Sequence, residues 1–242
     1  MKSSIVKVLS LACVMLCLSN VSQAQLRWGF YINGVLPTGQ FTSDVSTADR
    51  VALVPLTMSE MGKGATLGFG GGVRATYHFD VGTGMVAPFV NLDIFWNSID
   101  SKLSNAYSDT RLDAPSYFNF PLFVGATYLY DELWNDITPF AEFGLGPDLM
   151  IITSEGTESK EFRYGYKNTT SMAFMIGLGS YFGRHVSAGI YYYGLGTHNI
   201  DYTTRTLRNN ELAAAQDELY RGLNQRERRS VGELALRIGF HF

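Results

Sequence analysis

Cysteine, charge and long apolar runs are all scarce in this chain. Both cysteines, Cys13 and Cys17, fall within the first 24 residues, so disulfides and thiolate chemistry are excluded from the rest. Charged residues make up 17% of the chain, below the roughly one quarter that is typical of proteins in general. No later segment has the roughly 18 consecutive apolar residues of a membrane-spanning helix. Such a chain can cross a membrane only as a closed β-barrel, because lipid cannot satisfy an open sheet edge.

The N-terminal segment has the three parts of a secretory signal peptide. Lys2 and Lys7 supply positive charge, an apolar run covers residues 5–18, and the small-residue motif Ser22-Gln-Ala24 follows. The apolar run is too short for a transmembrane helix. We therefore expect an exported protein whose signal peptide is cleaved before Gln25.

Cleavage would divide the chain into a signal peptide, residues 1–24, and one domain, residues 25–242. The 17 Lys and Arg residues left after that cleavage, against 22 acidic residues, give a net charge of −5. An acidic chain of this kind lacks the basic surface that binds polyanions. We expect no nucleic-acid partner.

The C-terminal residues 234–242 alternate between apolar and other side chains without a break. Side chains in a β-strand change face at every residue, so the apolar ones share one face of a single strand. These apolar residues are Leu234, Leu236, Ile238, Phe240 and Phe242. The pattern resembles the C-terminal assembly signal of bacterial outer-membrane barrels, which implies the barrel-assembly machinery as a partner.

Seven more segments alternate in the same way and have the length of barrel strands. The eight expected strands lie within residues 26–33, 66–79, 86–97, 117–128, 137–146, 172–182, 186–192 and 234–242. Their connections alternate between short (80–84, 131–136, 183–185) and long (37–64, 98–115, 153–169, 198–229). This predicts an all-β fold: an eight-stranded antiparallel up-and-down transmembrane β-barrel with long extracellular loops and short periplasmic turns.

Aromatic residues gather near the ends of the expected strands. In a membrane barrel such residues form girdles at the two lipid–water interfaces. The expected girdle consists of Trp28, Tyr77, Phe79, Trp96, Tyr128 and Trp134. The alternative, an aromatic core of a soluble β-domain, leaves the asymmetry of the connections unexplained.

Charged residues on the opposite faces of these strands would point into the lumen. They are three bases and three acids: Arg27, Arg74, Asp93, Glu142, Glu233 and Arg237. The interior of an eight-stranded barrel is just wide enough for side chains to fill it. Buried charges require partners, so the balanced set predicts a salt-bridged plug rather than an open channel. A gate or a proton path is the functional alternative.

Enzymatic and metal chemistry have little support in the sequence. His198 has no serine at a useful spacing in the chain, and no nucleophile, base and oxyanion set stands out. Acidic residues of the expected loops lack the dense spacing of a calcium loop. These are Asp44, Asp49, Glu155, Glu158 and Glu161. We expect no catalytic residues, no metal site and no cofactor.

Two of the long connections have compositions of their own. Asn209–Arg229 has the composition of a surface helix, with acid near its start and arginines near its end, although an extended hairpin is also open. Residues 51–61 are apolar for an exposed segment, and such patches often mark contacts with a partner.

The chain resembles the small outer-membrane β-barrels of the OmpA/OmpX-like and PorT-like groups that are common in Bacteroidetes. The resemblance rests on the signal peptide, the alternating strands, the segment Phe118–Phe123, the Gly144-Leu-Gly146 pattern and Phe242. It implies a protein in the outer membrane of a Gram-negative bacterium, in contact with its lipid. The implied role is a structural or interaction role in the envelope, including that of an accessory subunit of a secretion or motility assembly. A small-solute porin or gated channel and a lipid-A-modifying enzyme are the alternatives.

Overall fold

A closed antiparallel barrel dominates the computed structural model, which describes residues 26–42, 64–82, 84–99, 116–130, 136–153, 155–156, 162–206 and 227–242. Its eight strands are β1 (Leu26–Thr38), β2 (Ala65–Tyr77), β4 (Gly84–Ile99), β5 (Tyr117–Tyr130), β6 (Ile137–Ile152), β9 (Thr169–Phe182), β10 (Val186–Ile200) and β12 (Glu227–His241). The short strand β3 (Phe79–Asp80) continues the pairing of β2 with β4. A 3-10 helix, η2 (Gly39–Thr42), follows β1.

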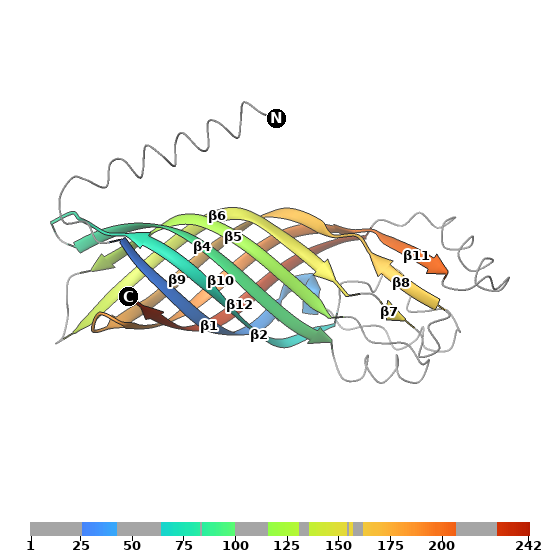
Figure 1. Ribbon diagram of the computed structural model, residues 1–242, viewed down its shortest axis with the longest axis horizontal. Coiled ribbons are helices and arrows are strands. Elements are labelled where there is room, and N and C mark those ends of the chain that lie inside the picture. The colour runs from blue at the N-terminus through green and yellow to red at the C-terminus, as the bar shows by residue number, and fades with distance from the viewer. Residues whose placement is uncertain are drawn as a thin grey trace, which may run out of the picture.

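Every barrel strand pairs with its neighbours in the chain, and the first strand pairs with the last. The order is β2-β1-β12-β10-β9-β6-β5-β4, and β2 also pairs with β4, so no edge remains open (Figure 1). The β1–β12 seam runs from Gly29 opposite His241 to Thr38 opposite Gly232. The predicted eight-stranded up-and-down antiparallel barrel is confirmed.

Both barrel ends of the chain lie at the same end of the barrel as the tight turns. The amide of Phe242 donates to the carbonyl of Trp28 at 2.8 Å, which joins β12 to the start of β1. Beside them, the His241 amide donates to His185 at 2.8 Å, and the Gly183 amide donates to Asp136 at 2.7 Å. Asp136 and the turn at residues 183–185 therefore lie at this end, which we call the turn end; the opposite end is the outer end.

The outer wall of the barrel is apolar. Alternate residues of each strand point away from the lumen, and Leu67, Met172 and Leu236 are 68%, 70% and 66% exposed. A band of exposed large apolar side chains around a whole barrel would be strongly unfavourable in water. In lipid the same band is the expected surface of a membrane-spanning barrel. No helix among the described residues is long and apolar enough to cross a membrane.

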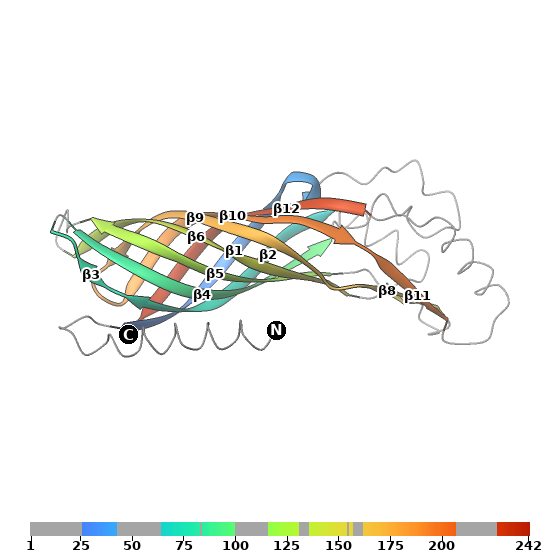
Figure 2. The same cartoon turned by 90° about the horizontal axis from the view of Figure 1, so that it is seen from above.

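Strand structure continues beyond the barrel at the outer end. A second sheet has the order β11-β8-β7 and comprises β7 (Glu155–Gly156), β8 (Phe162–Tyr166) and β11 (Tyr202–Thr206). Figure 2 shows β8 and β11 projecting past the barrel side by side. The connections expected at residues 153–169 and 198–229 therefore contain strand structure, as the extended-hairpin alternative for the second of them allowed. β8 follows β6 in the chain and β11 follows β10. The two strands pair with each other in antiparallel register.

The barrel strands are also longer than the alternating segments suggested. β1 extends to Thr38 and β10 to Ile200, because ladder pairing continues beyond the last clearly alternating residue. Residues 227–229, which the sequence suggested as the end of a helix, lie in β12. The rest of that expected helix, the apolar segment 51–61 and the predicted signal peptide lie outside the described residues.

Candidate functional site in the barrel lumen

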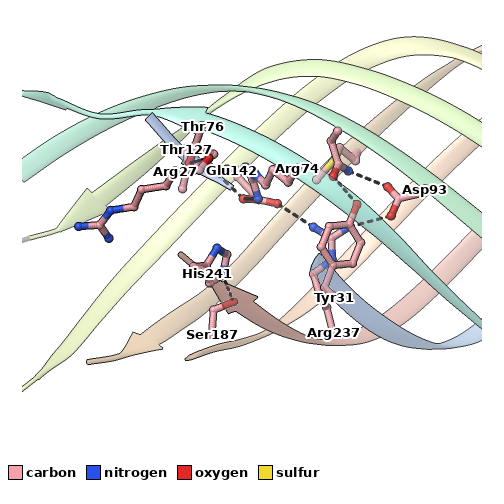
Figure 3. A network of polar contacts seen from close by, with 12 residues as sticks. Arg27, Tyr31, Arg74, Thr76, Asp93, Thr127, Glu142, Ser187, Arg237 and His241 are labelled. Carbon is pink, nitrogen blue, oxygen red and sulfur yellow. Dashed lines mark hydrogen bonds and ion pairs between the residues drawn. The ribbon is translucent and has the colours of Figure 1, made fainter. Parts of the chain in front are cut away.

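Four charged side chains meet inside the barrel. Arg74 donates from Nη1 to Oε2 of Glu142 at 2.7 Å, and Arg237 donates from Nη2 to Oδ1 of Asp93 at 3.3 Å. Nη1 of Arg237 also lies 3.5 Å from Oε1 of Glu142, which joins the two pairs (Figure 3). The four residues come from β2, β6, β12 and β4, so the ion pairs cross the lumen. We call this set the central network.

The central network is deeply buried and balanced in charge. Its side chains are at most 4% exposed, and two guanidinium groups face two carboxylates. Buried ions of one sign would be costly in this environment, whereas paired and hydrogen-bonded ions are tolerated. The barrel thus holds its central charges as a neutral unit.

Aromatic rings cover the two sides of the Arg237 guanidinium. Its Cζ lies 3.6 Å from the ring centroid of Tyr31 and 4.1 Å from that of Tyr191. The same side chain donates to Oδ1 of Asn33 at 3.2 Å and to the hydroxyl of Tyr193. Cation–π contact with desolvated rings adds to the ion pairs. The Arg237 guanidinium is therefore held by aromatic rings and by hydrogen bonds to neighbouring side chains.

Arg74 occupies a comparable position closer to the turn end. Its Cζ lies 3.9 Å from the ring centroid of Phe89, and Nη2 donates to Oγ1 of Thr127 at 2.7 Å. The Thr127 hydroxyl donates in turn to Glu142 at 3.0 Å. The Arg74–Glu142 pair thus has a neutral hydrogen-bond partner that both residues share.

Asp93 is held by neutral side chains as well as by Arg237. Asn91 donates from Nδ2 to Oδ2 of Asp93 at 2.7 Å, while the Tyr31 hydroxyl donates to Oδ1 of Asn91. All three residues are at most 3% exposed. This chain of hydrogen bonds connects a tyrosine that packs on Arg237 with the carboxylate that pairs with Arg237.

Interior glycines make room for the large rings. A Cβ at Gly125 would lie 2.6 Å from Cζ of Phe89, and one at Gly72 would lie 2.6 Å from Cζ of Tyr31. Contacts this short do not occur between real atoms, so side chains there would displace the rings. The glycines that interrupt the alternating pattern are thus required, because aromatic side chains fill the space beside them in the lumen.

Two of the six charged residues expected in the lumen lie outside the central network. Glu233 is fully buried nearer the outer end, where Asn97 donates to its Oε2 at 3.5 Å. Arg27 lies in the first residues of β1 at the turn end, is half-buried, and points away from the central network (Figure 3). The alternating pattern identifies inward faces but does not resolve depth along the lumen.

The outer part of the lumen contains a histidine, a carboxylate and a serine that are distant in sequence. Nε2 of His198 lies 3.1 Å from Oδ2 of Asp148 and 3.2 Å from Oγ of Ser171. The chain has no serine at a useful spacing from His198, but the fold brings Ser171 on β9 beside it on β10. The set is not a catalytic triad: carboxylate and hydroxyl face the same ring nitrogen, and Ser171 donates to the carbonyl of Leu195.

A second polar group lies at the turn end. Nε2 of His241 and the hydroxyl of Ser187 are 2.9 Å apart, and the His241 ring packs against Tyr181 with centroids 4.8 Å apart. Nδ1 of His185 lies 2.9 Å from the carbonyl oxygen of His241. The His241–Ser187 contact joins the neighbouring strands β12 and β10, and the ring contact reaches β9, which favours a role in holding the barrel together.

The proposed assembly residues and girdle aromatics point outward where the structure describes them. Leu234, Leu236, Ile238, Phe240 and Phe242 are all exposed on the outer wall of β12 and beyond its end. The Phe30 ring packs on Phe240 and Phe242, with centroids 5.3 and 5.7 Å apart.

The girdle aromatics divide between the two ends of the barrel. Trp28, Phe79 and Tyr128 are exposed near the turn end, and Tyr77 packs on Phe79 with centroids 4.6 Å apart. Trp96 lies toward the outer end, 4.9 Å from the Phe69 ring. Trp134 lies outside the described residues.

Metal-binding groups are sparse in the described part of the chain. No cluster of three or more His, Cys, Asp and Glu side chains there has an arrangement that could hold a metal ion. Asp44, Asp49, Glu158 and Glu161 lie outside the described residues.

No protein-family profile matches the sequence, and no curated protein matches it. Among solved structures, Neisserial surface protein A aligns with 91% of this chain and 100% of its own, at 12% identity and a TM-score of 0.43. A major outer membrane protein from Thermus thermophilus aligns with 90% of this chain and 100% of its own, at 13% identity and a TM-score of 0.44. OprG from Pseudomonas aeruginosa aligns over 91% and 98%, at 10% identity and a TM-score of 0.40. Similarities at this level carry no argument about function, and the fold assignment rests on the strand register above.

Proposed function

We propose that this protein is an integral outer-membrane β-barrel of a Gram-negative bacterium whose lumen does not conduct ions. The central network carries the proposal. Arg74, Glu142, Arg237 and Asp93 link β2, β6, β12 and β4 across the lumen, and aromatic rings fill the space around the two guanidinium groups. An ion would have to displace several paired charges at once to pass. The apolar outer wall supports the location in a membrane.

Conductance of the purified mature protein in planar bilayers tests the closed lumen. We expect no stable channel openings. Insertion is verified on the same preparation by quenching of tryptophan fluorescence with brominated lipid, since Trp28 faces outward near the turn end. Stable single-channel openings of the inserted protein would reject the proposal in favour of the porin or gated-channel alternative.

We further propose a non-enzymatic role in which the outer end is presented to a partner in the envelope, as in an accessory subunit of a secretion or motility assembly. The pairing of β8 with β11 beyond the barrel supports this role, because it builds a defined sheet outside the lipid-facing wall. The Ser171–His198–Asp148 geometry gives no support to hydrolysis.

Mild detergent extraction of native outer membranes, cross-linking and native electrophoresis with mass spectrometry test the partner role. Recovery in a large assembly with fixed companions is expected. Migration at the mass of the free chain would reject the accessory role. Altered lipid A in cells that overexpress the protein would instead favour a lipid-modifying enzyme.

A further inference from the structure

The outer part of the lumen contains polar side chains that the central network does not use. Asn97 on β4, Asn119 on β5, Asp148 on β6 and Glu233 on β12 are each 0% exposed. Asn97 Nδ2 contacts Oε2 of Glu233 at 3.5 Å, which links β4 to β12 across the lumen. We call these four residues the outer cluster.

The strand register places Asn119 between two other members of the outer cluster. The residue opposite Asn119 on β4 is Phe95, two positions from Asn97. On β6 the residue opposite is Met150, two positions from Asp148. Residues two apart on a strand share a face, so the three polar side chains lie on adjacent parts of the inner wall.

Within the described part of the chain, each member of the outer cluster has an oxygen atom without a hydrogen-bond partner. These atoms are Oδ1 of Asn97, Oδ1 of Asn119, Oδ1 of Asp148 and Oε1 of Glu233. For Asn119, the amide nitrogen is also without a partner. Buried polar atoms in folded proteins nearly always have partners. Four such oxygens from four strands therefore point to a ligand that is coordinated by oxygen atoms.

The charge of the outer cluster points to a cation. Asp148 and Glu233 are both fully buried, and neither forms an ion pair with Lys or Arg among the described residues. The nearest basic group is His198, 3.1 Å from Oδ2 of Asp148. Arg229 lies opposite His198 in the β10–β12 register and has an interaction partner.

We propose that the outer cluster binds a calcium ion through these carboxylate and amide oxygens. Ca²⁺ accepts irregular sets of carboxylate and amide oxygens, whereas Mg²⁺ requires near-octahedral geometry and retains its water. Only two carboxylates contribute, so the dissociation constant is expected in the range of about 10⁻⁴–10⁻³ M, as in extracellular calcium modules. The inference does not depend on the proposed non-conducting role, because it concerns a different part of the lumen.

Thermal unfolding of the refolded mature protein in detergent micelles tests the site. Because the ligand atoms are fully buried, the protein is refolded separately in millimolar CaCl₂, in MgCl₂ and in EDTA, at equal ionic strength. Ca²⁺ at ten times its dissociation constant is expected to raise the midpoint by about 3–6 °C relative to EDTA. Mg²⁺ is expected to raise it much less. Equal midpoints in all three conditions would overturn the proposal.

Variants separate binding from general effects on folding. Glu233→Gln keeps the shape of the side chain and is expected to abolish the Ca²⁺ shift, while Asp80→Asn, which removes a carboxylate at the turn end, is expected to retain it in full. Tb³⁺ luminescence sensitised by nearby tyrosines gives a direct readout of binding. Saturable luminescence that Ca²⁺ displaces, and that Asn119→Leu loses, is expected. A Ca²⁺ shift of wild-type size in Glu233→Gln would reject the site.

Discussion

In the middle of the lumen, Asp93 and Glu142 each lie beside an arginine, whereas in the outer part Asp148 and Glu233 have no Arg or Lys partner among the described residues. Both regions are fully enclosed by the same strands. The comparison shows that burial alone does not fix how a carboxylate is stabilised. In the central network, arginine side chains compensate the carboxylates. In the outer cluster, we infer that a cation bound from solution does so.

The largest effect is expected where the central balance is broken. Arg237→Met leaves Asp93 without its arginine while Glu142 keeps Arg74, so one of the two buried acids loses its compensation. We expect a loss of about 3–5 kcal/mol in the free energy of unfolding, measured by urea titration in detergent. The double variant Arg237→Met/Asp93→Asn also removes the unpaired carboxylate, and it is expected to recover part of this loss. A double variant no more stable than Arg237→Met alone would contradict the ion-pair account.

A second comparison concerns glycines inside and outside the barrel. A Cβ at Gly125 would meet the Gly144 Cα at 2.6 Å and the Phe89 ring, while a Cβ at the exposed Gly34 would have nothing within 4 Å. Gly125→Ala is expected to cost about 1–3 kcal/mol, because the ring that packs on Arg74 must move. Gly34→Ala is expected to change the unfolding midpoint little. Similar midpoints for the two variants would show that the lumen is less tightly filled than described.

The sequence predicted the barrel because alternation has the period of a strand and is visible in every segment. It also identified Arg74, Asp93, Glu142 and Arg237 as inward-facing charges from their place opposite apolar residues. The sequence did not predict which charges form pairs. Arg74 and Glu142, for example, lie on β2 and β6, and the distance between them depends on how the strands are staggered.

Contacts between distant segments were missed for the same reason. Ser171 reaches His198 only because β9 and β10 are neighbours, and β8 pairs with β11 only because two excursions leave the barrel side by side. Neither pairing has a local signal in the chain. Tyr31 and Tyr191 fall within the expected strands 26–33 and 186–192, but nothing in the sequence indicated that both rings pack on one guanidinium.

The smallest effect is expected from Glu233→Gln in the outer part of the lumen, and the sharpest contrast from its comparison with Asp93→Asn in the middle. In EDTA, Asp93→Asn removes a partner of Arg237 and is expected to cost about 1–3 kcal/mol. Glu233→Gln under the same conditions removes a buried carboxylate that has no Arg or Lys beside it among the described residues, and keeps an oxygen that Asn97 can reach. The free energy of unfolding is therefore expected to stay the same or to rise by about 1 kcal/mol. A loss in Glu233→Gln equal to that in Asp93→Asn would mean that protein groups already compensate Glu233, and the two parts of the lumen would then bury charge in the same way.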